Sequence, residues 1–196
     1  MGNVTAAMVG ELRGRTGAGV KDCLEALKQS DGDFDRAVDC IRKRGLESAG
    51  KKSTRTTAEG LIESYIHFGS KIGVLMEVKC ETDFVAKNEE FKQLARDLCM
   101  HIAAAAPQFI NRDEVPRDLI DKEQEIAVAQ VKDKPQPVLQ KIVTGKMDKF
   151  YAEVCLMEQP FVKEPDYRVK DILAAKIAKI GENLVISRFT RYQLGE

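Results

Sequence analysis

Residues 62–80 read IESYIHFGSKIGVLMEVKC, and this stretch decides which kind of fold to expect. Apolar and polar residues alternate on either side of Gly69 and Ser70, and a period of two is typical of half-buried β-strands. Gly69 and Ser70 supply a tight turn, so the stretch predicts a β-hairpin with one apolar face. The residues predicted on that face are Ile62, Ser64, Ile66, Phe68, Ile72, Val74, Met76, Val78 and Cys80.

A long helix is expected directly after the hairpin. Asn88 is its predicted N-cap, Glu89 and Glu90 favour the positive end of the helix dipole, and Pro107 ends the helix. Its apolar residues recur at helical spacing and form one buried stripe. The stripe consists of Phe91, Leu94, Ala95, Leu98, Ile102 and Ala105.

The remaining C-terminal elements complete a mixed core. Residues 111–158 are charged and helical in tendency, so we expect a helical excursion there. A second helical stripe runs from Val169 to Ile180, and residues 184–192 are β-branched and aromatic enough for a third strand. Residues 59–196 therefore predict an α+β core with a three-stranded antiparallel sheet packed on helices.

The first 45 residues predict three short helices, because glycine-bearing turns interrupt their apolar stripes twice. Asp33 is positioned to cap the third helix and Gly45 to end it. Such a small bundle suits a docking module better than an independent domain. Residues 46–58 are the predicted basic linker. The positive charges in and just before it are Arg42, Lys43, Arg44, Lys51, Lys52 and Arg55.

The charge balance narrows the classes of function. The chain has 196 residues, with 31 Lys and Arg against 31 Asp and Glu, so its formal net charge is zero. This balance disfavours a polybasic nucleic-acid binder, whose affinity comes from neutralising phosphates. No apolar run is long enough to span a bilayer, and the first residues lack the order of a signal peptide. We therefore expect a cytoplasmic protein without a membrane partner.

Cysteine spacing and glycine motifs give no sign of a metal or cofactor site. The five cysteines are an odd number without a CxxC pair, so free thiols are expected. Neither GxxxxGK[ST] nor GxGxxG is present, so direct nucleotide binding is not expected. One enzymatic alternative stays open, in which Cys80 is a nucleophile and His67 or His101 its base.

Residues 80–87, CETDFVAK, join the second strand to the long helix. Thr82 or Asp83 can cap a helix by accepting its first main-chain N–H groups. Phe84 has two possible roles. Its ring can fold back into the core, or it can stand outside the turn as a rigid anchor for a partner's pocket.

Three stretches resemble, in the same order, segments of the translation elongation factor Ts family. They are LRGRTGAGVKDCLEAL at 12–27, EVKCETDFVAK at 77–87 and KIGENLV at 179–185. The resemblance implies a translation factor that is not an enzyme. It would be a guanine-nucleotide exchange factor that binds the GDP form of elongation factor Tu, promotes GDP release and so restores the GTP form.

The resemblance also implies which residues contact the partner. Thr82, Asp83, Phe84 and Val85 would form a loop that disturbs the magnesium site of elongation factor Tu, with Phe84 as a wedge between helices. The N-terminal module resembles a ubiquitin-associated (UBA)-like bundle that docks on the same partner. Its docking residues, by carry-over, are Arg13, Thr16, Gly17, Val20 and Lys21.

The length resembles that of short family members, which hold one copy of the core and pair as homodimers. Some of these are linked by a cysteine in the last strand, where this chain has Thr190. The expected homodimer is therefore non-covalent. A rival function is an RNA-associated translation accessory protein that uses the basic linker, although no RNP-type aromatic pattern for base stacking is visible. No sequence-specific nucleic-acid partner is expected.

Overall fold

The structure, a computed structural model, describes residues 4–131 and 135–195. The chain divides into two compact units, and each is described separately. The first unit contains the residues up to Leu61, together with Val78–Lys92 and Asp171–Val185. The second contains Ile62–Glu77, Gln93–Lys170 and the residues from Ile186 onward.

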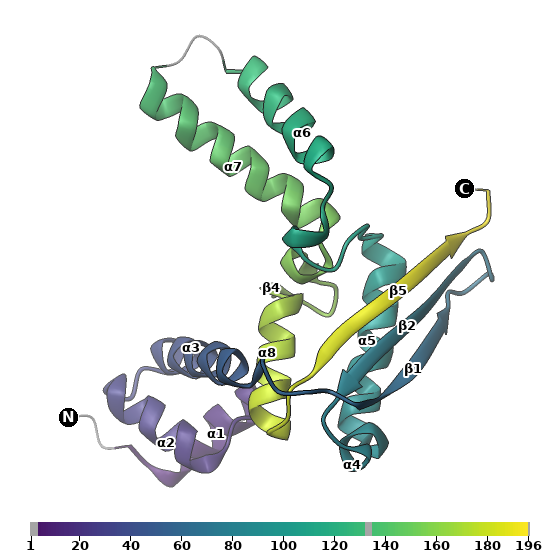
Figure 1. Cartoon of the computed structure of the whole chain (residues 1–196). Coiled ribbons are helices and arrows are strands. Elements are labelled where there is room, and N and C mark those ends of the chain that lie inside the picture. The colour runs from purple at the N-terminus through teal and green to yellow at the C-terminus, as the bar shows by residue number, and fades with distance from the viewer. Residues whose placement is uncertain (1–3, 132–134, 196) are drawn as a thin grey trace. The chain divides into compact units, whose positions relative to one another are not determined.

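The first unit begins with three helices, α1 (Ala6–Thr16), α2 (Val20–Gln29) and α3 (Phe34–Lys52), as predicted (Figure 1). Asp33 caps α3 by accepting the N–H of Arg36 at 3.0 Å, which confirms its predicted role. The three helices share one small hydrophobic core. Its fully or almost fully buried members are Val9, Leu12, Cys23, Ala26, Leu27 and Ala37.

The predicted end of the third helix at Gly45 is wrong, because α3 continues to Lys52 and Gly45 is buried inside it. A Cβ added at Gly45 would lie 3.8 Å from the carbonyl oxygen of Ala174, an ordinary contact distance, so α3 packs against α8 (Val169–Ile180) at this position. The Lys52 ammonium group reaches the carbonyl oxygen of Ile177 at 3.4 Å. Packing against α8 thus outweighs the low helix propensity of glycine, and the predicted linker 46–58 is helical as far as Lys52.

The central sheet has the strand order β1 (Glu59–Ile66), β2 (Ile72–Cys80), β5 (Val185–Gln193). Within the second unit, the N–H of Leu194 bonds to the carbonyl of Lys71, and Arg188 bonds to Glu77. Residue numbers therefore fall along β5 as they rise along β2, and the strands are antiparallel. The predicted hairpin, third strand and α+β class are confirmed.

The prediction that the hairpin has a single apolar face is wrong. The N–H of His67 bonds to the carbonyl of Ile72, a register that places even-numbered residues of β1 opposite odd-numbered residues of β2. Opposed residues share a face. The even-numbered residues of β2, such as Val74 and Met76, are buried, whereas Ile62 and Ile66 are 65% and 64% exposed on the other face.

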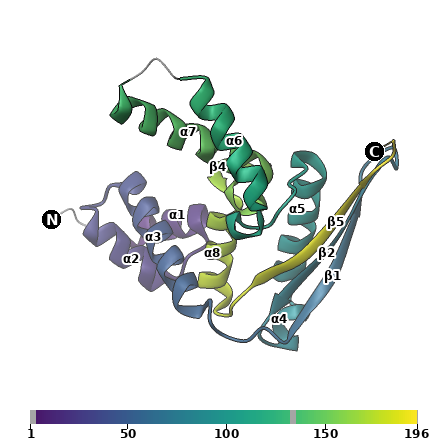
Figure 2. The same ribbon diagram turned by 45° about the horizontal axis from the view of Figure 1, so that its top comes forward.

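The buried face of the sheet is covered by α5 (Glu89–Ala105), as Figures 1 and 2 show. The Cys99 thiol contacts the carbonyl of Glu63 at 3.7 Å, and the Arg191 guanidinium contacts that of Ala103 at 3.3 Å. The predicted stripe is buried as far as Ile102, and Asn88 accepts the N–H of Glu90 at 2.7 Å, as expected of a cap.

The predicted helical excursion is an antiparallel hairpin of α6 (Arg117–Ala129) and α7 (Gln136–Val154), seen clearly in Figure 2. The short 3₁₀ helices η1 (Arg112–Glu114) and η2 (Leu156–Glu158) flank the hairpin, and β3 (Pro160–Phe161) pairs with β4 (Glu164–Arg168) after it. The base of the excursion is held by its own small core around Val115, Val154 and Cys155. No helix in the described part of the chain is long and apolar enough to cross a membrane.

Candidate functional site

The turn between β2 and α5 carries a five-residue helix, α4 (Asp83–Lys87), that presents Phe84 to solvent. Thr82 is its N-cap, with an extended backbone and a hydroxyl that accepts the N–H of Val85 at 3.5 Å. The ring of Phe84 is 81% exposed, so it does not fold back into the core. An apolar side chain held outside its own core is free to act as an anchor for another protein.

The Asp83 carboxylate, next to Phe84 in the sequence, forms an ion pair with Lys87. The Lys87 ammonium group lies 2.7 Å from the Asp83 carboxylate, one helical turn away. The hydrogen bond from Lys87 holds the pKa of Asp83 below its usual value, so the carboxylate is ionised at neutral pH. An exposed aromatic ring and a charged carboxylate therefore belong to consecutive residues of α4, and Val85, the next residue, is half-buried.

The backbone before α4 is fixed by the segment between α8 and β5. Glu182 accepts the N–H groups of Glu81 at 3.0 Å and Thr82 at 3.1 Å, and its other oxygen accepts the Thr82 hydroxyl at 2.6 Å. In return the Glu81 carboxylate accepts the N–H of Asn183 at 2.6 Å. Sequence reasoning gave Glu182 and Asn183 no role. The available signal was their place in the stretch 179–185, directly after the glycine that ends a helix.

Cys80 supports the same turn and has no nucleophilic character. Its thiol is buried and donates to the carbonyl of Thr82 at 3.2 Å. Burial raises the pKa of the Cys80 thiol to about 11, so the group is protonated at neutral pH and is not the thiolate that attack requires.

The two histidines considered as bases are engaged within the second unit. The Nδ1 atom of His101 accepts the N–H of Val162, so its Nε2 carries the proton and donates to Gln159 at 2.9 Å. Burial lowers the pKa of His101, which is neutral at pH 7. His67 is hydrogen-bonded to the Tyr65 hydroxyl at 3.0 Å.

The docking residues predicted in the N-terminal module surround the turn between α1 and α2. Gly17 ends α1 with φ +67°, a left-handed conformation that favours glycine. Thr16 donates to the carbonyl of Leu12 and accepts the N–H of Ala18, which closes the turn. The side chain of Val20 is 55% exposed at the start of α2. Arg13 and Lys21 are exposed as well.

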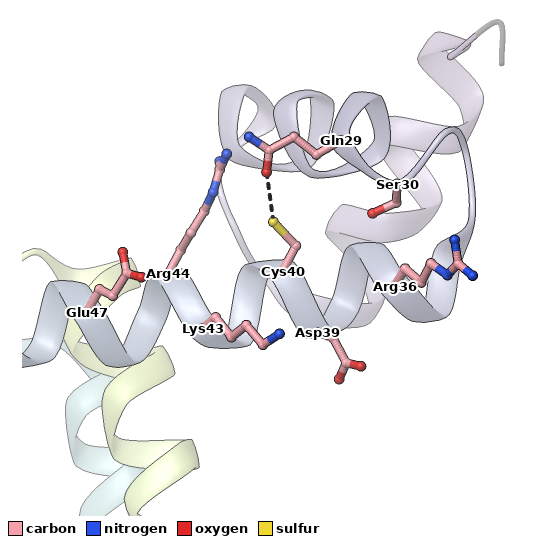
Figure 3. Close-up of a pocket in the computed structure, with 8 residues that line it drawn as sticks. All are labelled: Gln29, Ser30, Arg36, Asp39, Cys40, Lys43, Arg44 and Glu47. Carbon is pink, nitrogen blue, oxygen red and sulfur yellow. Dashed lines mark hydrogen bonds between the residues drawn. The ribbon is translucent and has the colours of Figure 1, made fainter. Parts of the chain in front are cut away.

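A shallow groove between α2 and α3 carries mixed charge (Figure 3). Its lining residues are Gln29, Ser30, Arg36, Asp39, Cys40, Lys43, Arg44 and Glu47. The Cys40 thiol donates to Gln29 at 3.1 Å, and Arg44 pairs with Glu25 at 3.1 Å. The lining contains no histidine, and the hydrogen bond of the Cys40 thiol goes to an amide oxygen. Across the described ranges, no group of three His, Cys, Asp or Glu side chains is placed to hold a metal ion.

Most of the basic side chains around the predicted linker form ion pairs or hydrogen bonds within the first unit. Arg42 pairs with Asp171 at 2.9 Å, and Arg55 lies 3.5 Å from Glu81. Lys52 and Arg44 are also hydrogen-bonded, whereas Lys43 and Lys51 are exposed. Cations that already neutralise carboxylates gain less from a phosphate backbone, so this region is a weak candidate for RNA binding.

Comparison with known proteins identifies the family to which the chain is similar. The sequence model of a family described as Elongation factor TS matches residues 48–196. Proteins named elongation factor Ts are similar over nearly the whole chain. That of Thermodesulfovibrio yellowstonii is 53% identical over 194 residues, covering 98% of this chain and 97% of the relative. Those of Carboxydothermus hydrogenoformans and Alkaliphilus oremlandii are 54% and 55% identical, covering 98% and 99% of this chain and 90% of each relative.

These similarities show that the chain is a translation elongation factor. Within that class, it belongs to the elongation factor Ts family.

Proposed function

We propose that the chain is the guanine-nucleotide exchange factor of elongation factor Tu and acts in the cytoplasm. It binds the GDP form of that GTPase, promotes GDP release and so restores the GTP form, by protein–protein binding without bond-making of its own. The observation that carries the proposal is the exposure of Phe84, 81%, on a capped helix within a stretch that resembles the family.

The loop Thr82–Val85 suits a wedge that weakens nucleotide binding. GDP is held through phosphate contacts and a magnesium ion, so moving the elements that hold the metal weakens these interactions together. In this proposal Phe84 enters between helices of the partner, and the Asp83 carboxylate rearranges polar contacts near the metal. The rigid ring and the fixed charge of Asp83 are both available without refolding of α4.

A second contact with the partner is needed on energetic grounds. Burying one Phe contributes about 1.5–3 kcal/mol, whereas shifting an equilibrium by about 10⁴-fold requires about 5.5 kcal/mol of differential binding. We assign the second contact to the UBA-like N-terminal module. Its exposed residues Val20, Lys21 and Arg13, with Thr16 and Gly17 shaping the turn, form the docking surface.

We further propose that two copies pair through the open face of the sheet. Ile62 and Ile66 of β1, Leu75 of β2 and Tyr192 of β5 are all more than half exposed, and the strand registers place them on one face. Ser64, Thr190 and the Glu77–Arg188 ion pair lie among them. An exposed face that mixes apolar side chains with paired charges fits a second copy of the same chain. Thr190 is exposed on that face where a cysteine would be needed for a covalent link, so the pair is non-covalent.

A nucleotide-release assay tests the proposed function. Elongation factor Tu loaded with a fluorescent GDP analogue is mixed with excess unlabelled GDP, with and without the chain. We expect release to accelerate in proportion to the concentration of the chain until it saturates. Release at the unassisted rate, with a correctly folded chain at micromolar concentration, would contradict the proposal.

A further inference from the structure

Glu182 holds the turn before α4 from a position 100 residues further along the chain. Its Oε2 atom accepts the N–H groups of Glu81 and Thr82, and its Oε1 atom accepts the Thr82 hydroxyl. One carboxylate therefore takes three hydrogen bonds from two consecutive residues. Such charge-assisted bonds are short and strong, and together they fix the main chain of the turn.

The contact is reciprocal and includes the chain that follows α3. Glu81 accepts the N–H of Asn183, and the buried side-chain amide of Asn183 donates to the carbonyls of Ser53 at 3.4 Å and Arg55 at 3.0 Å. We call Glu81, Thr82, Glu182 and Asn183 the polar clamp. It joins three segments that lie far apart in the sequence, all within the first unit.

The short helix α4 cannot hold its own conformation. It has five residues and none is buried, and isolated helices much longer than this are marginal in water. The position of the Phe84 ring therefore depends on the backbone that enters α4, which is the backbone that Glu182 fixes. A ring that is held in place before binding loses less freedom on binding, so its contact with a partner is stronger.

We infer that Glu182 is a positioning residue for nucleotide exchange. It touches neither nucleotide nor metal, and acts by fixing the direction in which Phe84 enters the partner. The inference rests on the proposed function. A carboxylate suits the task because both oxygens only accept, which matches two N–H groups and a hydroxyl. A glutamine retains one accepting oxygen and can still donate to the Thr82 hydroxyl oxygen, so it keeps part of the clamp.

A double-mutant cycle on the release rate separates positioning from general stability. At a chain concentration below saturation, we expect Glu182→Ala to slow GDP release about tenfold, as the loss of charge-assisted hydrogen bonds implies. Glu182→Gln recovers most of this loss. In a Phe84→Ala background, Glu182→Ala changes release less than about twofold, because there is no ring to position. Equal losses in the two backgrounds would overturn the inference.

A matched control removes a carboxylate elsewhere. Glu125→Ala, at an exposed position of α6, is expected to leave the release rate within about twofold of the wild-type value. Circular dichroism and thermal melting establish that each variant is folded at the assay temperature. If Glu182→Ala is not folded there, Glu182→Gln takes its place in the cycle, with a smaller expected loss that again disappears in the Phe84→Ala background.

Amide hydrogen exchange tests the clamp without any partner. In Glu182→Ala, the amides of Glu81 and Thr82 are expected to exchange at least about tenfold faster, while those in the middle of α5 keep their rates. Glu182→Gln, which keeps one accepting oxygen, is expected to show a smaller increase. Unchanged exchange at Thr82 would overturn the inference whatever the release assay gives. If the wild-type chain does not accelerate GDP release from elongation factor Tu, but the Thr82 amide exchanges faster once Glu182 is replaced, the result would contradict only the proposed function.

Discussion

The Glu90 carboxylate, in the first turn of α5, lies 2.6 Å from the Lys179 ammonium group near the end of α8. Lys176, one turn earlier on α8, contacts the same oxygen at 2.7 Å. The Lys179 side chain also lies beside Gly17, where an added Cβ would be 3.7 Å away. One lysine of the stretch 179–185 thus contacts the start of α5 and the turn between α1 and α2.

This ion pair makes stability depend on pH in a defined direction. Burial acts to raise the pKa of Glu90, but the two lysines outweigh burial and hold it below its usual value. A depressed pKa stabilises the fold above the unfolded value, about 4.3, and this contribution disappears as the pH falls through the folded pKa. We expect Glu90→Gln to lower the free energy of unfolding at pH 7 and to matter progressively less as the pH falls below about 4.3. Urea unfolding across this pH range measures the loss. A loss that does not change with pH would show that the charge is not responsible.

Replacing Phe84 by alanine is expected to slow GDP release from elongation factor Tu about 10- to 100-fold, which corresponds to the loss of about 1.5–3 kcal/mol of apolar burial. Part of the binding remains, because the N-terminal module still docks. Stopped-flow release and a binding isotherm on the same variant measure both quantities. The control is Ile126→Ala, which truncates an exposed apolar residue of α6. Release at the wild-type rate by Phe84→Ala would remove the wedge from the proposal.

A charge placed at Val20 tests the docking surface. Val20→Glu is expected to raise the concentration of the chain needed for half-maximal GDP release about tenfold or more, because a carboxylate would be desolvated in the contact. The release rate at saturation should stay near the wild-type value, since the wedge is intact. Val138→Glu, at a similarly exposed position of α7, is the matched control. A loss confined to the saturating rate would show that Val20 does not contribute to docking.

The open face of the sheet can be tested by sedimentation. The wild-type chain is expected to sediment as a dimer at micromolar concentration with or without reductant, and Leu75→Glu as a monomer, because a buried unpaired carboxylate destabilises the interface. Val162→Glu changes an exposed residue elsewhere in the second unit and should remain dimeric. A monomeric wild-type chain would eliminate the homodimer.

Gly60 is required by the close approach of β1 to β2. A Cβ at this position would lie 2.3 Å from the carbonyl oxygen of Val78 and 2.8 Å from the Cα of Lys79, both main-chain atoms. We expect Gly60→Ala to lower the free energy of unfolding by about 1–3 kcal/mol. Gly14→Ala, in an open position on α1, should instead raise it by up to about 1 kcal/mol through helix propensity. Denaturant unfolding of the two variants gives the comparison.

Local signals in the sequence predicted most of the elements. Asp33 and Asn88 cap helices where capping chemistry placed them, and the β-branched residues after Leu184 form the third strand. The prediction that the third helix ends at Gly45 is wrong because packing against α8 continues the helix. A local sequence pattern carries no information about that contact. The hairpin register was missed for a related reason, since alternation in each strand does not tell which residues of the two strands are opposed.

The candidate site was only partly predictable. Family resemblance pointed to Thr82–Val85, but composition alone left the position of Phe84 open, because a ring beside a helix cap can turn inward or outward. The role of Glu182 depends on hydrogen bonds to a turn 100 residues earlier. Such a contact leaves no periodicity or spacing in the sequence, and only the folded chain reveals it.

The continuity of α3 through Gly45 determines where the chain tolerates a change of length. Arg42, Gly45 and Lys52 all meet α8 from one side of this helix. Each residue of an α-helix turns the chain by about 100°, so one residue inserted between Gly45 and Lys52 would swing Lys52 away from Ile177. The same insertion after Arg55 would only lengthen the irregular segment that leads to β1. Natural variants of different length are therefore expected to differ after the helix and not within it.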